Sequence, residues 1–167
     1  ATTSQNGLIS TGDIATATKT YYQTAYSEDF AGVPLPAINA YSEKVLESSP
    51  LNRVFEQAAP GKDWAKGSSF SSKGYTNNSH SIKFEYSANE ANEVKIFGVT
   101  TTYANNTYTP SLTGGSVYYP VGVLYKTITK DENWTTGLDH TTEEFKNKQG
   151  QVILKRTYNN SEKHDTY

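Results

Sequence analysis

Three histidines are the first residues to consider for metal or acid–base chemistry, because imidazole titrates near neutral pH and binds zinc. They are His80, His140 and His164, and no two of them have the i, i+4 spacing that places two ligands on one helix face. The chain has no cysteine, so it offers no thiolate nucleophile and no disulfide. We therefore interpret the histidines as structural or surface residues and predict no metal site.

Two pairs of neighbouring carboxylates, Glu143-Glu144 and Asp131-Glu132, carry the residue types that glycoside hydrolases use. Neighbours on a strand point to opposite faces, so neither pair converges by itself. Asp131, Glu132 and Asn133 also offer oxygen ligands for calcium, but they lack the alternation and the closing glutamate of a calcium loop. We find no nucleophile–base–acid triad, phosphate-binding glycine loop or redox motif. The sequence therefore predicts no catalytic residue, no cofactor and no enzyme activity.

Aromatic rings can stack on sugars, and Trp64, Trp134 and Tyr125 are the candidates for a glycan-binding platform. The competing interpretation is that these rings pack the inner face of a sheet, as large aromatics do in most β proteins. Exposure separates the two: packing predicts that both tryptophans are buried, whereas glycan binding predicts both on one exposed platform.

Composition indicates which elements position these residues. Apolar residues make up 35% of the 167 residues, the mean hydropathy is −0.68, and the chain carries 13 tyrosines. Tyrosine and threonine suit half-buried sheets, which predicts a β-rich chain. The net charge is −2 without a Lys/Arg run, which excludes the class of nucleic-acid binders. No apolar stretch approaches the ~18 residues of a membrane-spanning helix.

Residues 1–39 are predicted to form a separate N-terminal region. It comprises a polar loop over residues 1–12, a helix over residues 11–26 and a linker over residues 27–39 that is broken by glycine and proline. The chain contains no methionine, begins at Ala1 and shows no signal-peptide pattern, which favours a processed or excised product.

Residues 40–167 are predicted to be β-rich, built mainly from antiparallel hairpins. The clearest strand is 81–86, in which apolar and charged residues alternate from Ile82 to Tyr86. Residues 62–79 are predicted to be a long mobile loop. Further strands are predicted at residues 42–48, 53–58, 94–103, around 108, 122–130, up to 145, and 151–158, with turns near Pro50, at 88–93, 105–106, 113–115 and 148–150.

Three segments resemble the Rhs/YD-repeat family of large Bacteroidetes proteins, in the order the family has them: YSEKVLESSPLNRVFEQAAPGKDW (residues 41–64), LYKTITKDENW (124–134) and TEEFKNKQGQVILKRTY (142–158). The closing HDTY resembles the point where the family enters its repeats, and the chain stops there as though cut within an element. Overall, residues 41–167 resemble the region that precedes and enters the YD repeats.

The resemblance implies a β-sheet shell that encloses a C-terminal toxin or other cargo and performs no chemistry of its own. We therefore expect a non-catalytic structural segment of a secreted or cell-surface bacterial protein. The expected partners are the rest of the parent chain, its cargo or further copies joined through open sheet edges, without nucleic acid and without a membrane span. The alternative is a glycan-binding or adhesin-like β module.

Overall fold

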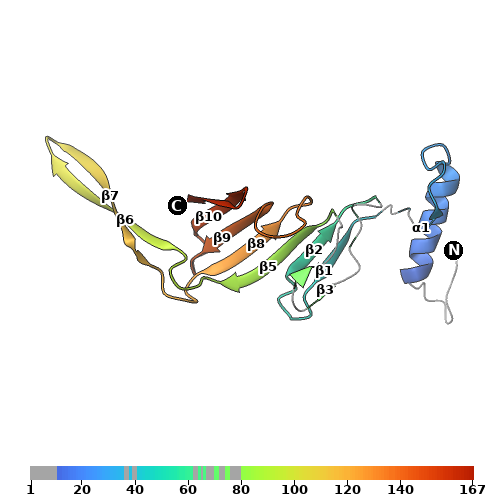
Figure 1. Ribbon diagram of the computed structural model, residues 1–167, viewed down its shortest axis with the longest axis horizontal. Coiled ribbons are helices and arrows are strands. Elements are labelled where there is room, and N and C mark those ends of the chain that lie inside the picture. Colours follow the sequence, from blue (N-terminus) through green and yellow to red (C-terminus); the bar gives the residue numbers. More distant parts are fainter. Residues whose placement is uncertain are drawn as a thin grey trace. The chain divides into compact units, whose positions relative to one another are not determined.

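The computed structural model describes residues 11–35, 38, 41–61, 64, 66, 70–71, 74–75 and 80–167. Within these residues the chain is mostly antiparallel β-sheet with a single α-helix (Figure 1), which confirms the predicted fold class. Most of the loop predicted at residues 62–79 lies outside the described residues. Its described part contains a short two-stranded sheet, in which Phe70 pairs with Tyr75, so the prediction of loop alone was wrong there.

The described chain contains one helix and eleven strands: α1 Thr11–Ala25, β1 Glu43–Leu46, β2 Val54–Ala58, β3 Phe70–Ser71, β4 Gly74–Tyr75, β5 Ile82–Ala88, β6 Lys95–Ala104, β7 Thr107–Tyr118, β8 Tyr125–Lys130, β9 Thr141–Lys146, β10 Val152–Asn159 and β11 Glu162–Thr166.

The chain divides into two compact units. Unit 1 takes the described residues up to Lys83 together with Asp131–Thr135, and unit 2 takes Phe84–Lys130 with Thr136–Tyr167. In unit 1 the strand order is β1-β2-β5, and in unit 2 it is β5-β8-β9-β10-β11. A boundary between residues 39 and 40 stays a prediction.

Helix α1 of unit 1 covers the predicted range to within one residue. Its alanines favour the helix and its threonines oppose it, so tertiary contacts must contribute. At its C-terminal end the ring of Tyr22 stacks on Tyr26 with centroids 5.7 Å apart and meets Phe30 edge-on at 6.2 Å. Gln23 donates a hydrogen bond to the carbonyl of Val33 (3.3 Å), which holds the following turn against the helix.

The β1–β2 hairpin turns near Pro50, as predicted, and an ion pair closes it. The Glu47 amide donates to the Arg53 carbonyl (2.9 Å), and the Arg53 guanidinium donates to both Glu47 carboxylate oxygens, with Nη2 2.7 Å from Oε2. The Ser49 hydroxyl donates to the same carboxylate (2.8 Å). The hydrogen bonds from Arg53, helped by the one from Ser49, lower the pKa of Glu47 from 4.5 to about 2.

Strand β5 pairs with β2 through Glu56↔Lys83 and Gln57↔Ile82. Alternating strands usually bury the apolar face, but here Lys83 is fully buried and Ile82 only partly so. The Lys83 ammonium donates to the Ser81 carbonyl (3.0 Å), and the Ser81 hydroxyl donates to the Glu56 carboxylate (2.5 Å). The buried face of unit 1 is therefore substantially polar.

The apolar core of unit 2 is small. It consists of Val94, Leu124, Phe145 and Leu154. Asn89 is buried beside it: its side-chain oxygen accepts from the Leu124 amide (2.8 Å), and its amide nitrogen donates to the Pro120 carbonyl (2.9 Å).

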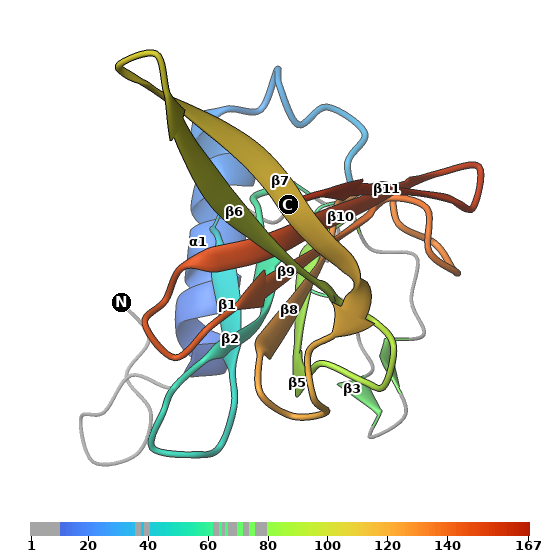
Figure 2. The same cartoon turned by 90° about the vertical axis from the view of Figure 1, so that its left-hand side faces the viewer.

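The sequence predicts a strand from residue 122, but strand β8 begins only at Tyr125, so the predicted start was wrong. The Gly122 amide donates to the Asn89 carbonyl and the Leu124 amide to the Asn89 side chain, so these donors are not available to the sheet. The predicted turn before β10 is confirmed, with Gly150 at φ 80°. Strand β11 pairs with β10 and ends the strand order, and Figure 2 shows this C-terminal hairpin.

Strands β6 and β7 form a long two-stranded ribbon, which turns at Asn105-Asn106 as predicted. Both asparagines have positive φ, as a type I′ hairpin requires. The interruption predicted at residues 113–115 is an irregularity within β7 rather than a turn: the strand continues, but its pairing with β6 shifts there, with Phe97 opposite Gly114 and Lys95 opposite Tyr118. Gly114 (φ 98°) and Gly115 (φ 84°) allow this, since a Cβ on Gly114 would overlap the Ile96 carbonyl oxygen across the ribbon.

Candidate functional site

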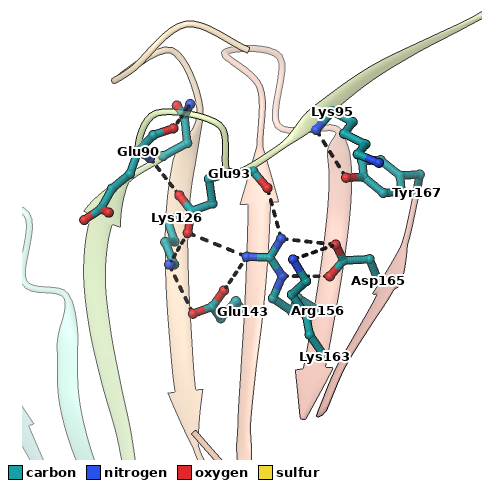
Figure 3. Close-up of polar contacts among 10 residues, drawn as sticks. Glu90, Glu93, Lys95, Lys126, Glu143, Arg156, Lys163, Asp165 and Tyr167 are labelled. Atoms are coloured by element: carbon teal, nitrogen blue, oxygen red, sulfur yellow. Dashed lines mark hydrogen bonds and ion pairs between the residues drawn. The ribbon is translucent and has the colours of Figure 1, made fainter. Parts of the chain in front are cut away.

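Charged side chains line up across four strands of unit 2. The strand register places Glu143 opposite Arg156, and Arg156 opposite Asp165. Lys126 comes from β8, and Glu93 comes from the segment before β6. Figure 3 shows these five side chains turned toward one another, and we call them the Arg156 cluster.

Arg156 is the centre of the cluster, with 5% of its side chain exposed. Its Nε lies 2.7 Å from Asp165 Oδ1 and its Nη2 lies 3.1 Å from Asp165 Oδ2, a bidentate pair. Its Nη1 lies 3.3 Å from Glu143 Oε2, and Nη2 also donates to the Glu93 carbonyl (3.0 Å). Lys126 Nζ bridges Glu93 Oε1 (2.6 Å) and Glu143 Oε1 (3.1 Å).

Burial and the neighbouring acidic groups have opposite effects on the pKa of both cations, Lys126 and Arg156. Burial lowers the pKa of Lys126, but hydrogen bonds to Glu93 and Glu143 outweigh it and raise that pKa above 10.5. Burial likewise lowers the pKa of Arg156, and its hydrogen bond and attraction to Asp165 outweigh it, so the net shift is upward. Both cations therefore stay charged inside the protein, and both lie over the Phe145 ring, at 5.2 and 5.6 Å from its centroid.

The cluster brings together Glu93 and Glu143, a carboxylate pair that inspection of sequence neighbours missed. The register of the β8–β9–β10 hairpins could have indicated Glu143, but not Glu93. Both carboxylates bind Lys126, so they are engaged in ion pairs rather than presented to a substrate. Glu143 and Glu144 point to opposite faces, and Glu144 pairs with Lys146 instead. This arrangement fixes strands in register and leaves no free acid or base.

A groove in unit 1 contains the first of the candidate aromatics. It has a volume of about 280 Å³ and lies at the end of β2, next to Trp64. Its lining residues include Ser42, Gln57, His80 and Ile82. Trp64 is 42% exposed, and its ring contacts His80 with centroids 5.4 Å apart. We call this the Trp64 groove.

The other candidates lie elsewhere. Trp134 is also in unit 1 but is 9% exposed, whereas Tyr125 is in unit 2 and 64% exposed. The tryptophans are thus neither both buried nor both on one exposed platform. The Asp131 carboxylate accepts a hydrogen bond from the backbone amide of Asn133 (2.8 Å), and the Asp131 backbone carbonyl accepts one from the amide of Trp134 (3.1 Å). Asp131 therefore shapes a turn.

The three histidines are not gathered into one site. His80 lines the Trp64 groove, His140 has a positive φ of 62°, and His164 is exposed on β11. Among the residues that the structure describes, no three His, Cys, Asp or Glu side chains are arranged to hold a metal ion.

The exposed apolar side chains of the β6–β7 ribbon are a feature that sequence reasoning missed. Residues 96–125 contain no Asp, Glu, Lys, Arg or His. The register places Val99 opposite Leu112 and Tyr103 opposite Tyr108 on one face, and all four are 58–73% exposed. The other face carries threonine, serine, glycine and alanine. The absence of charge was visible in the sequence and could have drawn attention to this segment.

Residues 1–78 match the family model of a domain of unknown function, DUF6443. No curated protein and no solved structure matches the chain. In the described part of the chain, no helix has the length and apolar character to cross a membrane.

Proposed function

We propose that this chain is a non-catalytic structural segment of a large secreted or surface Rhs-type protein, in which it helps to form a β-shell around a toxin or other cargo. The β6–β7 ribbon carries the proposal. A scattered exposed apolar side chain is normal, but several large apolar side chains gathered on one face indicate a surface that another protein covers.

The ribbon also needs support for a thermodynamic reason. An isolated two-stranded hairpin is marginally stable in water, and this one has open edges along ten-residue β6 and twelve-residue β7. Open edges without charge invite pairing with further strands. Neighbouring strands of a larger sheet would pair with the edges, and a second layer packed on the ribbon would cover Val99, Tyr103, Tyr108 and Leu112.

The sheet of unit 2 supports the same function. Strands β8 to β11 follow one another as antiparallel hairpins, and β11 leaves an edge at which a larger sheet could continue. The Arg156 cluster uses its charges to bind strands to one another. The resemblance of residues 41–167 to the Rhs region supplies the finer hypothesis that the larger sheet is a shell.

Amide hydrogen exchange tests the proposal. The 167-residue chain is compared with the full product of its gene, which by this proposal carries further strands. We expect β6 and β7 amides to exchange rapidly in the 167-residue chain and to be protected at least tenfold more in the full product. Equal exchange in both, or a gene that encodes no further β-sheet, would refute it. Amides of β9 and β10, which are paired on both sides, serve as the internal control.

A hydrolase screen tests the non-catalytic part. The purified chain is incubated with glycan, ester and peptide substrates, and we expect no turnover. Turnover that disappears in the Glu143→Gln variant would contradict the structural role of the Arg156 cluster.

A further inference from the structure

The Trp64 groove is held in shape by contacts that do not involve a ligand. The Ala59 amide donates to the Trp64 carbonyl (3.2 Å), which closes the loop between them. Gly61 has φ 108°, and a Cβ there would lie 3.3 Å from Trp64 Cδ1, so the indole packs over the bare glycine backbone. Trp64 is therefore a positioned aromatic ring with nearly half of its surface exposed to solvent.

The groove pairs this ring with hydrogen-bonding groups, and the acidic residue Glu132 is also among its lining residues. His80 Nδ1 lies 2.8 Å from the Glu132 backbone carbonyl. A carbonyl can only accept, so Nδ1 donates, and in the neutral ring Nε2 is left as an acceptor. Ser42 and Gln57 add a hydroxyl and an amide, each of which both donates and accepts. The described lining residues include no Lys or Arg, which disfavours a phosphate or carboxylate ligand.

We propose that the Trp64 groove binds one pyranose ring of a neutral glycan, with the sugar stacked on the indole and its hydroxyls bonded to His80 and Gln57. A sugar presents an apolar face bordered by hydroxyls that donate and accept, which matches an aromatic ring bordered by groups of both kinds. The volume of about 280 Å³ lies at the small end for ligand sites and suits a single ring.

A proline-rich peptide is the other ligand that stacks on exposed tryptophan. A proline ring has no donor, so it would leave the His80 acceptor unpaired, and an unpaired polar group in a contact is costly. The chemistry of the groove therefore favours the sugar. This site lies in unit 1 and is independent of the ribbon in unit 2 on which the structural function rests.

Indole N–H signals in NMR spectra test the proposal directly, because the chain has two tryptophans and only Trp64 lines the groove. The chain is titrated with cellohexaose, chitohexaose, mannohexaose, laminarihexaose and, separately, decaproline. We expect at least one oligosaccharide to shift the Trp64 signal, with a Kd on the order of 1 mM, which is what one ring of about twelve heavy atoms can provide.

Matched variants assign the binding to the groove. We expect Trp64→Ala to weaken oligosaccharide binding at least about tenfold and Gln57→Ala to weaken it severalfold. Tyr125→Ala, which removes an exposed ring outside the groove, should leave it unchanged. The Trp134 signal reports that Trp64→Ala still folds. No shift with any oligosaccharide at about 10 mM, binding that survives Trp64→Ala, or binding of decaproline alone would each overturn the proposal.

Discussion

Replacing Arg156 with methionine tests whether the Arg156 cluster stabilises unit 2. Methionine keeps much of the apolar stem but removes the charge of the guanidinium, its hydrogen bonds to Asp165, Glu143 and the Glu93 carbonyl, and its ion pair with the Glu93 carboxylate. Breaking a buried ion pair from one side costs about 3–5 kcal/mol, because the other charge is left buried. The lower end applies here, about 3 kcal/mol, since Glu143 keeps Lys126 and the Asp165 side chain is 21% exposed.

The size of unit 2 makes this loss easy to detect. Domains of this length have a total stability of about 4–12 kcal/mol, so the substitution removes a large share of it. Amide exchange in β9 and β10 is the suitable measurement, because both tryptophans lie in unit 1 and their fluorescence reports that unit. We expect protection in these strands to fall roughly a hundredfold.

Two further variants separate the cluster from general effects on the strand. Lys155→Met changes the exposed neighbour on the opposite face of β10, and we expect a change of no more than about 0.5 kcal/mol. Adding Glu143→Gln to Arg156→Met should cost less than the sum of the single changes, because the stranded carboxylate is gone. The reasoning is refuted if Arg156→Met leaves exchange as fast as Lys155→Met does.

Three more predictions follow from pKa shifts and backbone geometry. The pKa of Glu47 is about 2 in the folded chain against 4.5 ordinarily. The stabilisation that ionised Glu47 provides is therefore complete above about pH 4.5 and is lost as the pH falls toward 2. Urea unfolding followed by tryptophan fluorescence should show this loss of stability, and the Glu47→Gln variant should not show it. Gly114→Ala should destabilise the ribbon far more than Gly122→Ala, since both glycines have positive φ but only at Gly114 would a Cβ meet the facing backbone; exchange of β6 amides measures the difference. The pKa of Lys126 is raised above 10.5, so the contribution of its charge to folding stability is complete below that pH and is lost as the pH rises above it. Circular dichroism of alkaline unfolding should therefore show a smaller fall in stability for Lys126→Met than for the unchanged chain.

Local signals explain what could be predicted from the sequence. The turns near Pro50 and Gly150, the Asn105-Asn106 turn and helix α1 depend on residues next to one another, and all of them are where the sequence indicates. Gly114 was misinterpreted because its role is set across the ribbon by Ile96, eighteen positions earlier in the chain. Glycine predicts a turn locally, whereas here it permits a close approach of the two backbones where the pairing of a continuing strand becomes irregular.

Buried charge was the second limit of sequence reasoning. A pattern of alternating apolar and charged residues predicts that the charged face meets water, yet Lys83 is fully buried and Arg156 nearly so. The partners of Arg156 come from other strands and from the segment before β6, so no window of neighbouring residues contains them. The Trp64 groove likewise joins residues 42 to 132, and a single aromatic residue in the sequence says nothing of its neighbours in space.

The buried charges and the small core of unit 2 are best understood together. Four apolar side chains bury enough surface to hold strands together but only weakly specify their register, because a shift by two residues keeps every side chain on its face. The Arg156 cluster removes that freedom: a two-residue shift of β10 on β9 would move Arg156 from Glu143 to Phe145 or Thr141 and leave a carboxylate buried without its partner. Because charge pairs fix the register, the strands of this sheet do not slide past one another even though β11 leaves one edge open. This is the property that a segment needs if further strands are to be added to it in a defined order.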